Sequence, residues 1–332
     1  MRVNNSQRRR WHTAWLAAFV AAVAAAGGAS YAAMDTGPAT FGRDQIKEDL
    51  YAAQFVNEQQ AWLVGTFGSI FHTADGGTTW ERQQSGTLLP LFAVDFSDDQ
   101  HGWAVGKIGT ILRTTDGGRK WVSQKSPGEK HFLSVKAVTA NVAWAVGDWG
   151  FRASTDDGGA TWQDRSLEED VLMYGVDFTD ADHGMIVGEV GKVWTTTDGG
   201  RTWAQTQMPN KKSLFGVQMI DAQRAWAVGL DAEVWHTTDG GQTWVQVKTP
   251  ATQALYSVAF DGDLGWAVGD SGTVLVTSDR GATWRLLPVP LDLKLFWIHA
   301  VSLVPGTSGN RGMLVGANGL MRWTHHDQML QN

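Results

Sequence analysis

Short runs of alternating apolar and polar residues recur along almost the whole chain. In one unit, Phe92, Val94 and Phe96 lie on one face of a first run, and a polar turn follows at residues 98–101. The runs GWAVG, TILRTT and KWVSQ come next, separated by short turns. Alternation with a period of two, bounded by turn residues, predicts β-strands. Each unit therefore predicts four short antiparallel strands.

The unit returns about every 41 residues. One marker is the tryptophan that closes a D-G-G-x-T-W turn, at spacings of 41, 41, 41, 41 and 40 residues: Trp80, Trp121, Trp162, Trp203, Trp244 and Trp284. A second marker is the glycine that ends an A-V-G run: Gly65, Gly106, Gly147, Gly188, Gly229, Gly269 and Gly316. Seven repeats, starting near residues 50, 91, 132, 173, 214, 255 and 296, predict an all-β fold with a single seven-bladed β-propeller over residues 34–332.

The repeated D-G-G-x-T-W turn predicts a structural role. An Asp that begins a tight turn accepts hydrogen bonds from the backbone N–H groups that follow, and glycines adopt backbone angles that a Cβ disfavours. Six equivalent turns follow from six equivalent blades, whereas six equivalent catalytic sites around one ring would be unusual. The predicted turn residues are Asp75, Asp116, Asp157, Asp198, Asp239 and Asp279.

The seventh repeat, MLVGANGLMRWTHHD, lacks this turn and therefore lacks an obvious fourth strand. We expect residues 39–46 to supply the outer strand of blade seven and so close the ring, since closure removes exposed strand edges. The segment after His325 is the other candidate.

The turns between second and third strands differ most from one repeat to the next. In a propeller they share a face with the connections between blades. Phe67, Ile108 and Trp149 are bulky apolar residues at this place in three adjacent repeats, which predicts a partner-binding surface. The same rim carries three carboxylates: Asp148, Glu189 and Asp231. The alternative is that each apolar side chain covers the edge of its own blade.

Charge and composition exclude several classes of function. The chain has 27 Lys and Arg against 34 Asp and Glu, and without residues 1–33 its formal charge is −11, which argues against nucleic acid as a partner. With no cysteine, disulfides, lipoprotein anchoring and thiolate metal sites are excluded. His72 and His236 occupy a repeat position that elsewhere holds Arg, Ser, Thr or Val, so no metal site and no cofactor is predicted.

The N-terminus predicts export. A basic start, an apolar run from Trp15 to Ala26 and small residues before Ala33 fit a secretory signal peptide over residues 1–33. Cleavage after Ala32 or Ala33 would leave a periplasmic or lumenal protein. Retention would instead tether the propeller to the inner membrane.

The turn motif is similar to the Asp box of bacterial neuraminidase repeats, with matches at Thr73, Asp75, Gly77, Thr79 and Trp80. Those enzymes resemble one another in an arginine cluster, a tyrosine nucleophile with an acidic partner, and an Asp acid/base. Outside residues 1–33, the tyrosines occupy a repeat position that also accepts Phe, Leu or Trp, which is typical of packing: Tyr51, Tyr174 and Tyr256. A sialidase-like enzyme is therefore not favoured.

The joined unit GWAVGxxGxIxxTxDGGxTW, repeated in a single ring over residues 50–325, closely resembles the photosystem II stability/assembly factor family. The resemblance implies an exported, non-catalytic propeller that helps a membrane protein complex or its assembly intermediate, either a photosystem or an envelope exporter. We expect the propeller to be a monomer. The acidic composition departs from the basic partner-binding surface of plant and cyanobacterial members.

A second function from another class stays open, namely glycan binding or glycoside hydrolysis. Trp149 would then be a stacking platform, with Asp148, Glu189 or Asp231 as carboxylates. Carboxylates of a glycosidase must face each other roughly 5 to 10 Å apart.

Overall fold

We analysed a computed structural model of the chain, which describes residues 40–291, 293–307 and 311–329. The chain divides into two units, residues 1–37 and 38–332, and every described residue belongs to the second. The predicted signal peptide and its cleavage site lie outside the described residues. Within the described ranges, no helix is long and apolar enough to cross a membrane.

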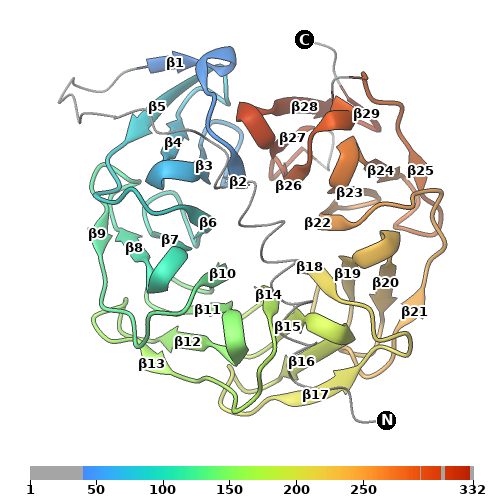
Figure 1. The fold of residues 1–332 in the computed structure, drawn as a ribbon, viewed down its shortest axis with the longest axis horizontal. Coiled ribbons are helices and arrows are strands. Elements are labelled where there is room, and N and C mark those ends of the chain that lie inside the picture. The colour runs from blue at the N-terminus through green and yellow to red at the C-terminus, as the bar shows by residue number, and fades with distance from the viewer. Residues whose placement is uncertain (1–39, 292, 308–310, 330–332) are drawn as a thin grey trace, which may run out of the picture. The chain divides into compact units, whose positions relative to one another are not determined.

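Seven antiparallel sheets surround a central axis as the blades of a propeller (Figure 1). Each blade holds four strands that follow one another in sequence, with the first strand nearest the axis and the fourth at the rim. Blade one carries a fifth strand. The predicted all-β, seven-bladed propeller is confirmed.

The first strands of blades one to seven are β2 (Leu50–Phe55), β6 (Leu91–Phe96), β10 (Phe132–Ala137), β14 (Met173–Phe178), β18 (Leu214–Met219), β22 (Leu255–Asp261) and β26 (Ile298–Leu303). The second strands are β3 (Ala61–Gly65), β7 (Gly102–Gly106), β11 (Ala143–Gly147), β15 (Gly184–Gly188), β19 (Ala225–Gly229), β23 (Leu264–Gly269) and β27 (Arg311–Gly316). The third strands are β4 (Ile70–Thr73), β8 (Ile111–Thr114), β12 (Arg152–Thr155), β16 (Lys192–Thr196), β20 (Val234–Thr237), β24 (Val274–Thr277) and β28 (Met321–His325). The fourth strands are β5 (Thr79–Gln83), β9 (Val122–Ser123), β13 (Gln163–Asp164), β17 (Ala204–Gln207), β21 (Val245–Gln246), β25 (Arg285–Leu286) and β29 (Gln328–Met329).

One-turn 3₁₀ segments join the second and third strands: η2 (Thr66–Gly68), η3 (Lys107–Gly109), η4 (Asp148–Gly150), η5 (Glu189–Gly191), η6 (Leu230–Ala232), η7 (Asp270–Gly272) and η9 (Ala317–Gly319). The remaining elements are β1 (Thr40–Gly42), η1 (Arg43–Gln45) and η8 (Leu293–Leu295).

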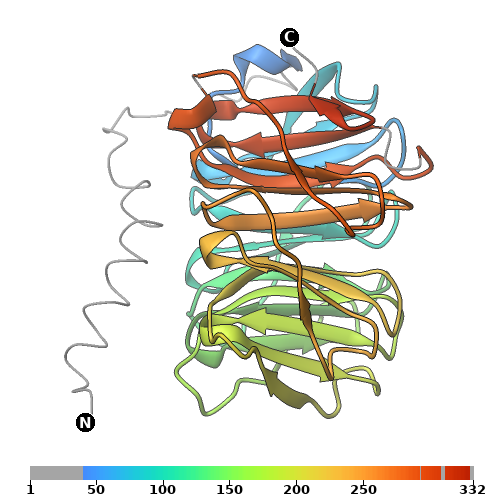
Figure 2. The same ribbon diagram turned by 90° about the vertical axis from the view of Figure 1, so that its right-hand side faces the viewer.

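The propeller has two different faces. On the connection face, the 3₁₀ turns meet the segments that lead to the next blade; in η3, for example, the Gly109 N–H donates to Lys130 O over 2.7 Å. On the opposite, Asp-box face, the turn between first and second strands meets the D-G-G turn, as where the Gly117 N–H donates to Gln100 O over 3.0 Å. Seen edge-on in Figure 2, the short coils of the 3₁₀ turns lie along one side of the ring.

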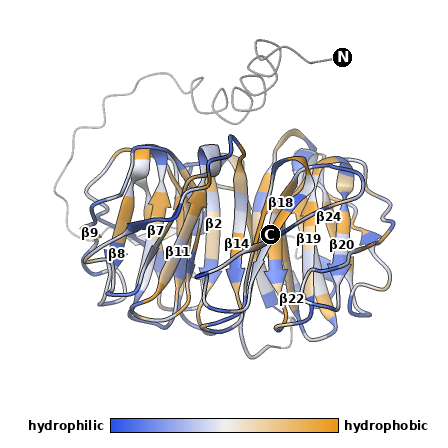
Figure 3. Ribbon diagram, turned by 90° about the horizontal axis from the view of Figure 1, so that it is seen from below, coloured by the Kyte–Doolittle hydropathy of each residue, from blue (hydrophilic) through white to orange (hydrophobic). Residues whose placement is uncertain are grey.

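The hydrophobic core lies between neighbouring blades. The strand β7 is buried at all five residues, because the blades on either side cover both of its faces. Trp103 and Val105 pack with Phe132 of blade three, whereas Ala104 between them packs with Trp62 of blade one. Figure 3 shows the result, with apolar residues concentrated along the strands and hydrophilic residues at many of the turns.

The expectation that residues 39–46 supply the outer strand of blade seven is wrong. The strand β1 pairs antiparallel with β5 of blade one, with Phe41 opposite Trp80. Blade seven takes its fourth strand, β29, from the segment after His325, which folds back on β28. A tight hairpin costs less chain entropy than a strand recruited from the other end of the chain.

Side chains, rather than an exchanged strand, join blade seven to blade one. The Phe55 N–H donates to Ser302 Oγ over 2.9 Å, and His299 Nδ1 lies 2.6 Å from Tyr51 O. Burial lowers the pKa of His299 to about 4, so the ring is neutral and the contact is a neutral hydrogen bond.

The segment before β2 also takes part in closure, in a different way from the one expected. It lies against η9 of blade seven, where the Asn318 N–H donates to Asp49 Oδ1 over 2.8 Å. Ile46 is buried in one apolar cluster with Val315 and Met321. The segment thus takes the place that an inter-blade connection has elsewhere in the ring.

The contact between Ser302 and Phe55 is one member of a continuous belt of such contacts. In every blade a polar side chain of the first strand accepts a hydrogen bond from a backbone N–H of the next blade's first strand. The acceptor and donor residues are Gln54 and Phe96, Asp95 and Ala137, Ser134 and Val176, Asp177 and Met219, Gln218 and Phe260, Ser257 and Val301, and Ser302 and Phe55. We call these seven contacts the inter-blade belt.

Candidate functional site

The central residue of each 3₁₀ turn on the connection face has a left-handed backbone. The φ angles lie between 52° and 56° at Phe67, Ile108, Trp149, Val190, Asp231, Ser271 and Asn318. Each turn reverses the chain within three residues, and a glycine or alanine follows the left-handed residue. The seven side chains therefore occupy equivalent places around the connection face.

Four consecutive blades carry a large apolar residue at this place. Phe67, Ile108, Trp149 and Val190 are 49%, 47%, 46% and 43% exposed. Their first strands contact one another in ring order, so the four residues lie on neighbouring blades. We call them the apolar tips. Sequence reasoning named the first three and missed Val190, although its repeat position was the signal that could have identified it.

The left-handed conformation is costly for the apolar tips, most of all for the two β-branched residues. A left-handed backbone disfavours an L-residue by roughly 1–2 kcal/mol, and for β-branched residues such as Ile108 and Val190 it is a clear outlier. Asp231 and Asn318, in the polar part of the ring, have the short polar side chains that tolerate this conformation best. The turn itself does not require apolar residues, because blades five to seven form the same turn with polar residues at this place.

Other exposed apolar side chains lie on the same face. Leu88 is 74% exposed in the connection from blade one to blade two, and Leu291 and Leu295 are 78% and 81% exposed in the connection from blade six to blade seven. Among the described residues, Ile220 is the large exposed apolar side chain in the turns of the Asp-box face. The connection face is therefore the more apolar of the two.

The carboxylates predicted for this rim have separate surroundings. Asp148 is 5% exposed and its Oδ2 lies 3.8 Å from Nδ1 of His131. Burial raises its pKa. Asp148 therefore does not belong to the surface, contrary to its assignment from sequence. Asp231 is exposed, and its Oδ2 lies 3.2 Å from Lys212 Nζ. Glu189 Oε2 accepts a hydrogen bond from the Leu172 N–H over 3.4 Å.

The three tyrosines that could have indicated a sialidase are packed among aromatic side chains. Tyr51 stacks on Trp297 at 5.6 Å between ring centres, and Phe215 lies 4.9 Å from Tyr174 and 5.8 Å from Tyr256. Burial raises the pKa of all three phenols, to about 12 at Tyr256. A nucleophile would need the opposite shift.

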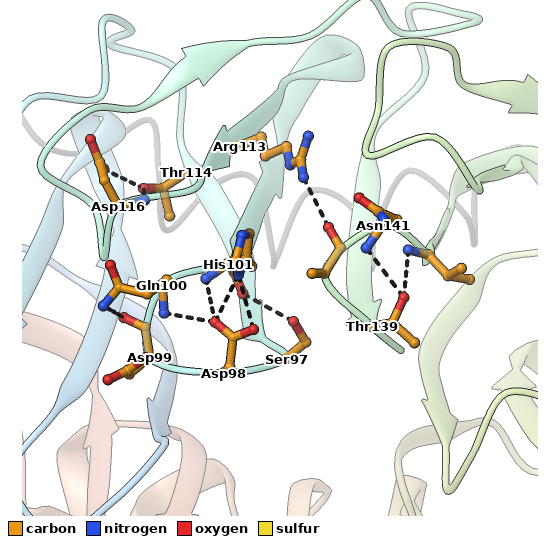
Figure 4. Close-up of polar contacts among 12 residues, drawn as sticks. Ser97, Asp98, Asp99, Gln100, His101, Arg113, Thr114, Asp116, Thr139 and Asn141 are labelled. Carbon is orange, nitrogen blue, oxygen red and sulfur yellow. Dashed lines mark hydrogen bonds and ion pairs between the residues drawn. The ribbon is translucent and has the colours of Figure 1, made fainter.

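The Asp-box turns use their polar groups internally (Figure 4). Thr114 Oγ1 donates to Asp116 Oδ1 over 2.9 Å. Asp116 Oδ1 also accepts the Lys120 N–H over 2.9 Å. In the adjacent turn, Asp98 Oδ1 accepts the His101 N–H over 2.8 Å and lies 2.9 Å from its ring nitrogen. In the part of the chain that the structure describes, no group of three or more His, Asp or Glu could hold a metal ion.

The other Asp-box residues make the same kind of contacts. At Asp198 the Thr202 hydroxyl donates over 2.6 Å and the Thr202 N–H over 2.9 Å. Hydrogen bonds from that hydroxyl and N–H hold the pKa of Asp198 at about 2. Asp239 and Asp279 have equivalent partners and equally low pKa values. The carboxylates are thus ionised hydrogen-bond acceptors within their turns.

Comparison with known proteins points to one family. The model of the family described as "Photosynthesis system II assembly factor YCF48" matches residues 88–171, 119–204, 160–251 and 202–308. None of the curated proteins compared matches the chain significantly.

Solved structures share the fold. "YCF48 bound to D1 peptide" is 21% identical with a TM-score of 0.69, covering 90% of this chain and 100% of that one. YCF48 from Cyanidioschyzon merolae is 23% identical with a TM-score of 0.69, covering 85% and 97%. A GH74 xyloglucanase from Xanthomonas campestris also has a TM-score of 0.69, at 14% identity, covering 88% of this chain and 54% of that one. At these identities the likeness concerns the fold alone.

Proposed function

Because the chain belongs to the family of the photosystem II assembly factor YCF48, we propose that it is a non-catalytic scaffold that docks on a membrane protein complex or its assembly intermediate. Docking takes place through the connection face. The observation that carries this proposal is the run of four exposed apolar tips on consecutive blades, two of them β-branched residues in a left-handed conformation.

The arrangement of the tips suits a protein partner. A large aromatic side chain flanked by apolar neighbours is typical of the few residues that dominate the binding energy of an interface. Trp149 has this position, with Ile108 and Val190 on the adjacent blades. The polar tips of blades five to seven leave the rest of the ring less suited to such contact. A relative described as bound to the D1 peptide further supports a protein ligand.

The proposal includes export, on the basis of the N-terminal sequence. A basic start, an apolar run and small residues before Ala33 favour a secreted protein, periplasmic or lumenal. The partner is then a photosystem-type complex in a photosynthetic host or an envelope exporter in another host. We do not propose glycoside hydrolysis, because Asp148 is buried against His131 and does not face the surface.

The test replaces Trp149 with Ala and measures capture of membrane proteins from a detergent-solubilised envelope. Loss of a buried aromatic anchor worth a few kcal/mol should weaken capture of the partner about tenfold or more, with the melting temperature unchanged. The matched control is Ser271→Ala, at the equivalent tip of blade six. If Trp149→Ala lowers the melting temperature and leaves capture unchanged, Trp149 only covers its own blade and the docking surface is refuted.

A further inference from the structure

The outer strand of each blade is an edge that must be protected from pairing with other chains. As far as the described residues extend, five outer strands are only two residues long: β9, β13, β21, β25 and β29. In blade one β5 has five residues, and β1 pairs with it. In blade four β17 has four residues, each paired with β16, and within the described ranges no strand covers its outer side.

The sequence of β17 contains none of the usual protective features either. It reads Ala-Gln-Thr-Gln, without charge, proline or glycine, and Ala204, Gln205 and Gln207 are exposed. The Met208 N–H donates inward to Gly191 O over 2.8 Å. Because backbone groups of an antiparallel strand alternate in direction, Gln205 and Gln207 direct their N–H and C=O groups away from the blade.

The edge is continuous with the apolar tips. Gln207 Nε2 donates to the backbone O of Val190 over 2.8 Å. The C-terminal end of β17 is therefore hydrogen-bonded to the apolar tip of blade four. Thr206 Oγ1 donates to Gly241 O over 3.3 Å and holds the strand to blade five. A chain that covers the tips as far as Val190 reaches this edge next.

We propose that β17 is a docking edge, on which an extended segment of the protein docked at the apolar tips adds as a fifth strand of blade four. Main-chain hydrogen bonds to Gln205 and Gln207 supply the recognition, as in other cases of strand addition. Blade one shows that this fold accepts such a strand: β1 adds antiparallel to β5, and Phe41 packs on Phe71 at 6.1 Å between ring centres. This inference rests on the proposed function.

The first test is photo-crosslinking in the organism that makes the protein. The photoreactive residue p-benzoylphenylalanine replaces Gln205, Trp149 or Gln246, one at a time. Gln246 is the control, because it is the repeat equivalent of Gln205 on the two-residue strand β21. Positions 205 and 149 should crosslink to the same protein, and position 246 should not.

The second test removes one outward N–H by Gln205→Pro, a change that edge strands tolerate at such positions. Capture of the crosslinked protein should weaken about fivefold, the effect of about one lost backbone hydrogen bond. Gln246→Pro is the matched control and should change nothing. The Val247 N–H donates inward to Val234 O over 2.8 Å, so the backbone N–H of Gln246 likewise points away from its blade.

Each remaining outcome overturns a defined part of the argument. A crosslink at position 149 without one at position 205 refutes the docking edge and leaves the proposed function intact. No crosslink at either position refutes both. A crosslink from position 205 to a second copy of this chain assigns the edge to self-association and refutes the proposal. If Gln205→Pro fails to fold, the crosslinks alone decide.

Discussion

At the scale of single residues, the same backbone conformation serves two kinds of side chain. The left-handed position of each connection-face turn holds Asp231, Ser271 or Asn318 on one side of the ring and an apolar residue on the other. For Ile108 and Val190 the conformation costs free energy that a short polar residue would not cost. This cost is the observation on which the proposed contact role of the two residues rests.

We therefore expect Ile108→Asn and Val190→Asn to stabilise the isolated protein, each by about 1 kcal/mol, because Asn adopts the left-handed conformation more easily. Urea unfolding measures the change. The same variants should bind the membrane partner less tightly. Ser271→Asn is the control: it should stabilise the protein less, because serine is not β-branched, and it should leave partner binding unchanged. A loss of stability in the two variants would show instead that these side chains pack on their own blades.

At the scale of the element, the Asp-box turn is held by a carboxylate that remains ionised. Asp198, Asp239 and Asp279 each accept hydrogen bonds from the hydroxyl and the N–H of the Thr four residues later. A hydrogen bond to the charged form stabilises it, which lowers the pKa of these groups to about 2 in the folded state.

This shift predicts how stability depends on pH. The folded pKa of about 2 at Asp198 lies below the ordinary Asp value of about 3.9. The contribution of the group is therefore complete above about pH 4 and is lost as the pH falls through about 2. Melting temperatures measured from pH 5 to pH 2 should decline through this range. The decline should be shallower in Asp198→Asn, which binds no proton there; parallel curves for the two proteins would contradict the assignment.

At the scale of the whole molecule, the ring is closed by side chains. The inter-blade belt runs through all seven blades, and the contact between Ser302 and Phe55 closes it. In blade two the acceptor of the belt is Asp95, and the equivalent residue of blade three is Lys136, which cannot accept a hydrogen bond. In blade three Ser134, two residues earlier, accepts the Val176 N–H instead. Lys136 Nζ lies 2.9 Å from Asp177 Oδ1 and 3.8 Å from Asp95 Oδ2, so that it bridges blades two, three and four.

Replacing Ser302 with Ala should destabilise the whole propeller. The change leaves the buried Phe55 N–H without its acceptor at the junction of the first and last blades, at a cost of about 1–3 kcal/mol. Urea unfolding should show one cooperative transition at a lower midpoint. Ser257→Ala, which removes a longer contact of 3.3 Å, should cost less. An unchanged midpoint in Ser302→Ala would mean that the apolar contacts alone close the ring.

Some of the candidate site could be predicted from repeat position alone. Phe67, Ile108 and Trp149 occupy one column of the repeat, and equivalent positions of a ring must share one face. Val190 belongs to the same column, but valine is smaller than the other three residues, and it was therefore not predicted as part of the apolar surface. The burial of Asp148 could not be predicted, because it depends on His131, which comes from the connection to blade three and meets η4 only in the folded ring.

The sequence by itself determined the number of blades, their strand order and the position of each turn, because these depend on local periodicity and turn chemistry repeated seven times. Tertiary structure alone decided which segments cover the outer edges of the blades and how the ring closes. Residues 40–42 pair with blade one instead of blade seven for two reasons. The outer strand of blade seven comes from a local hairpin, and Phe41 packs against Phe71 and Trp80 of blade one. Contacts of this kind join residues far apart in the chain, and their free energy depends on packing that no local pattern records.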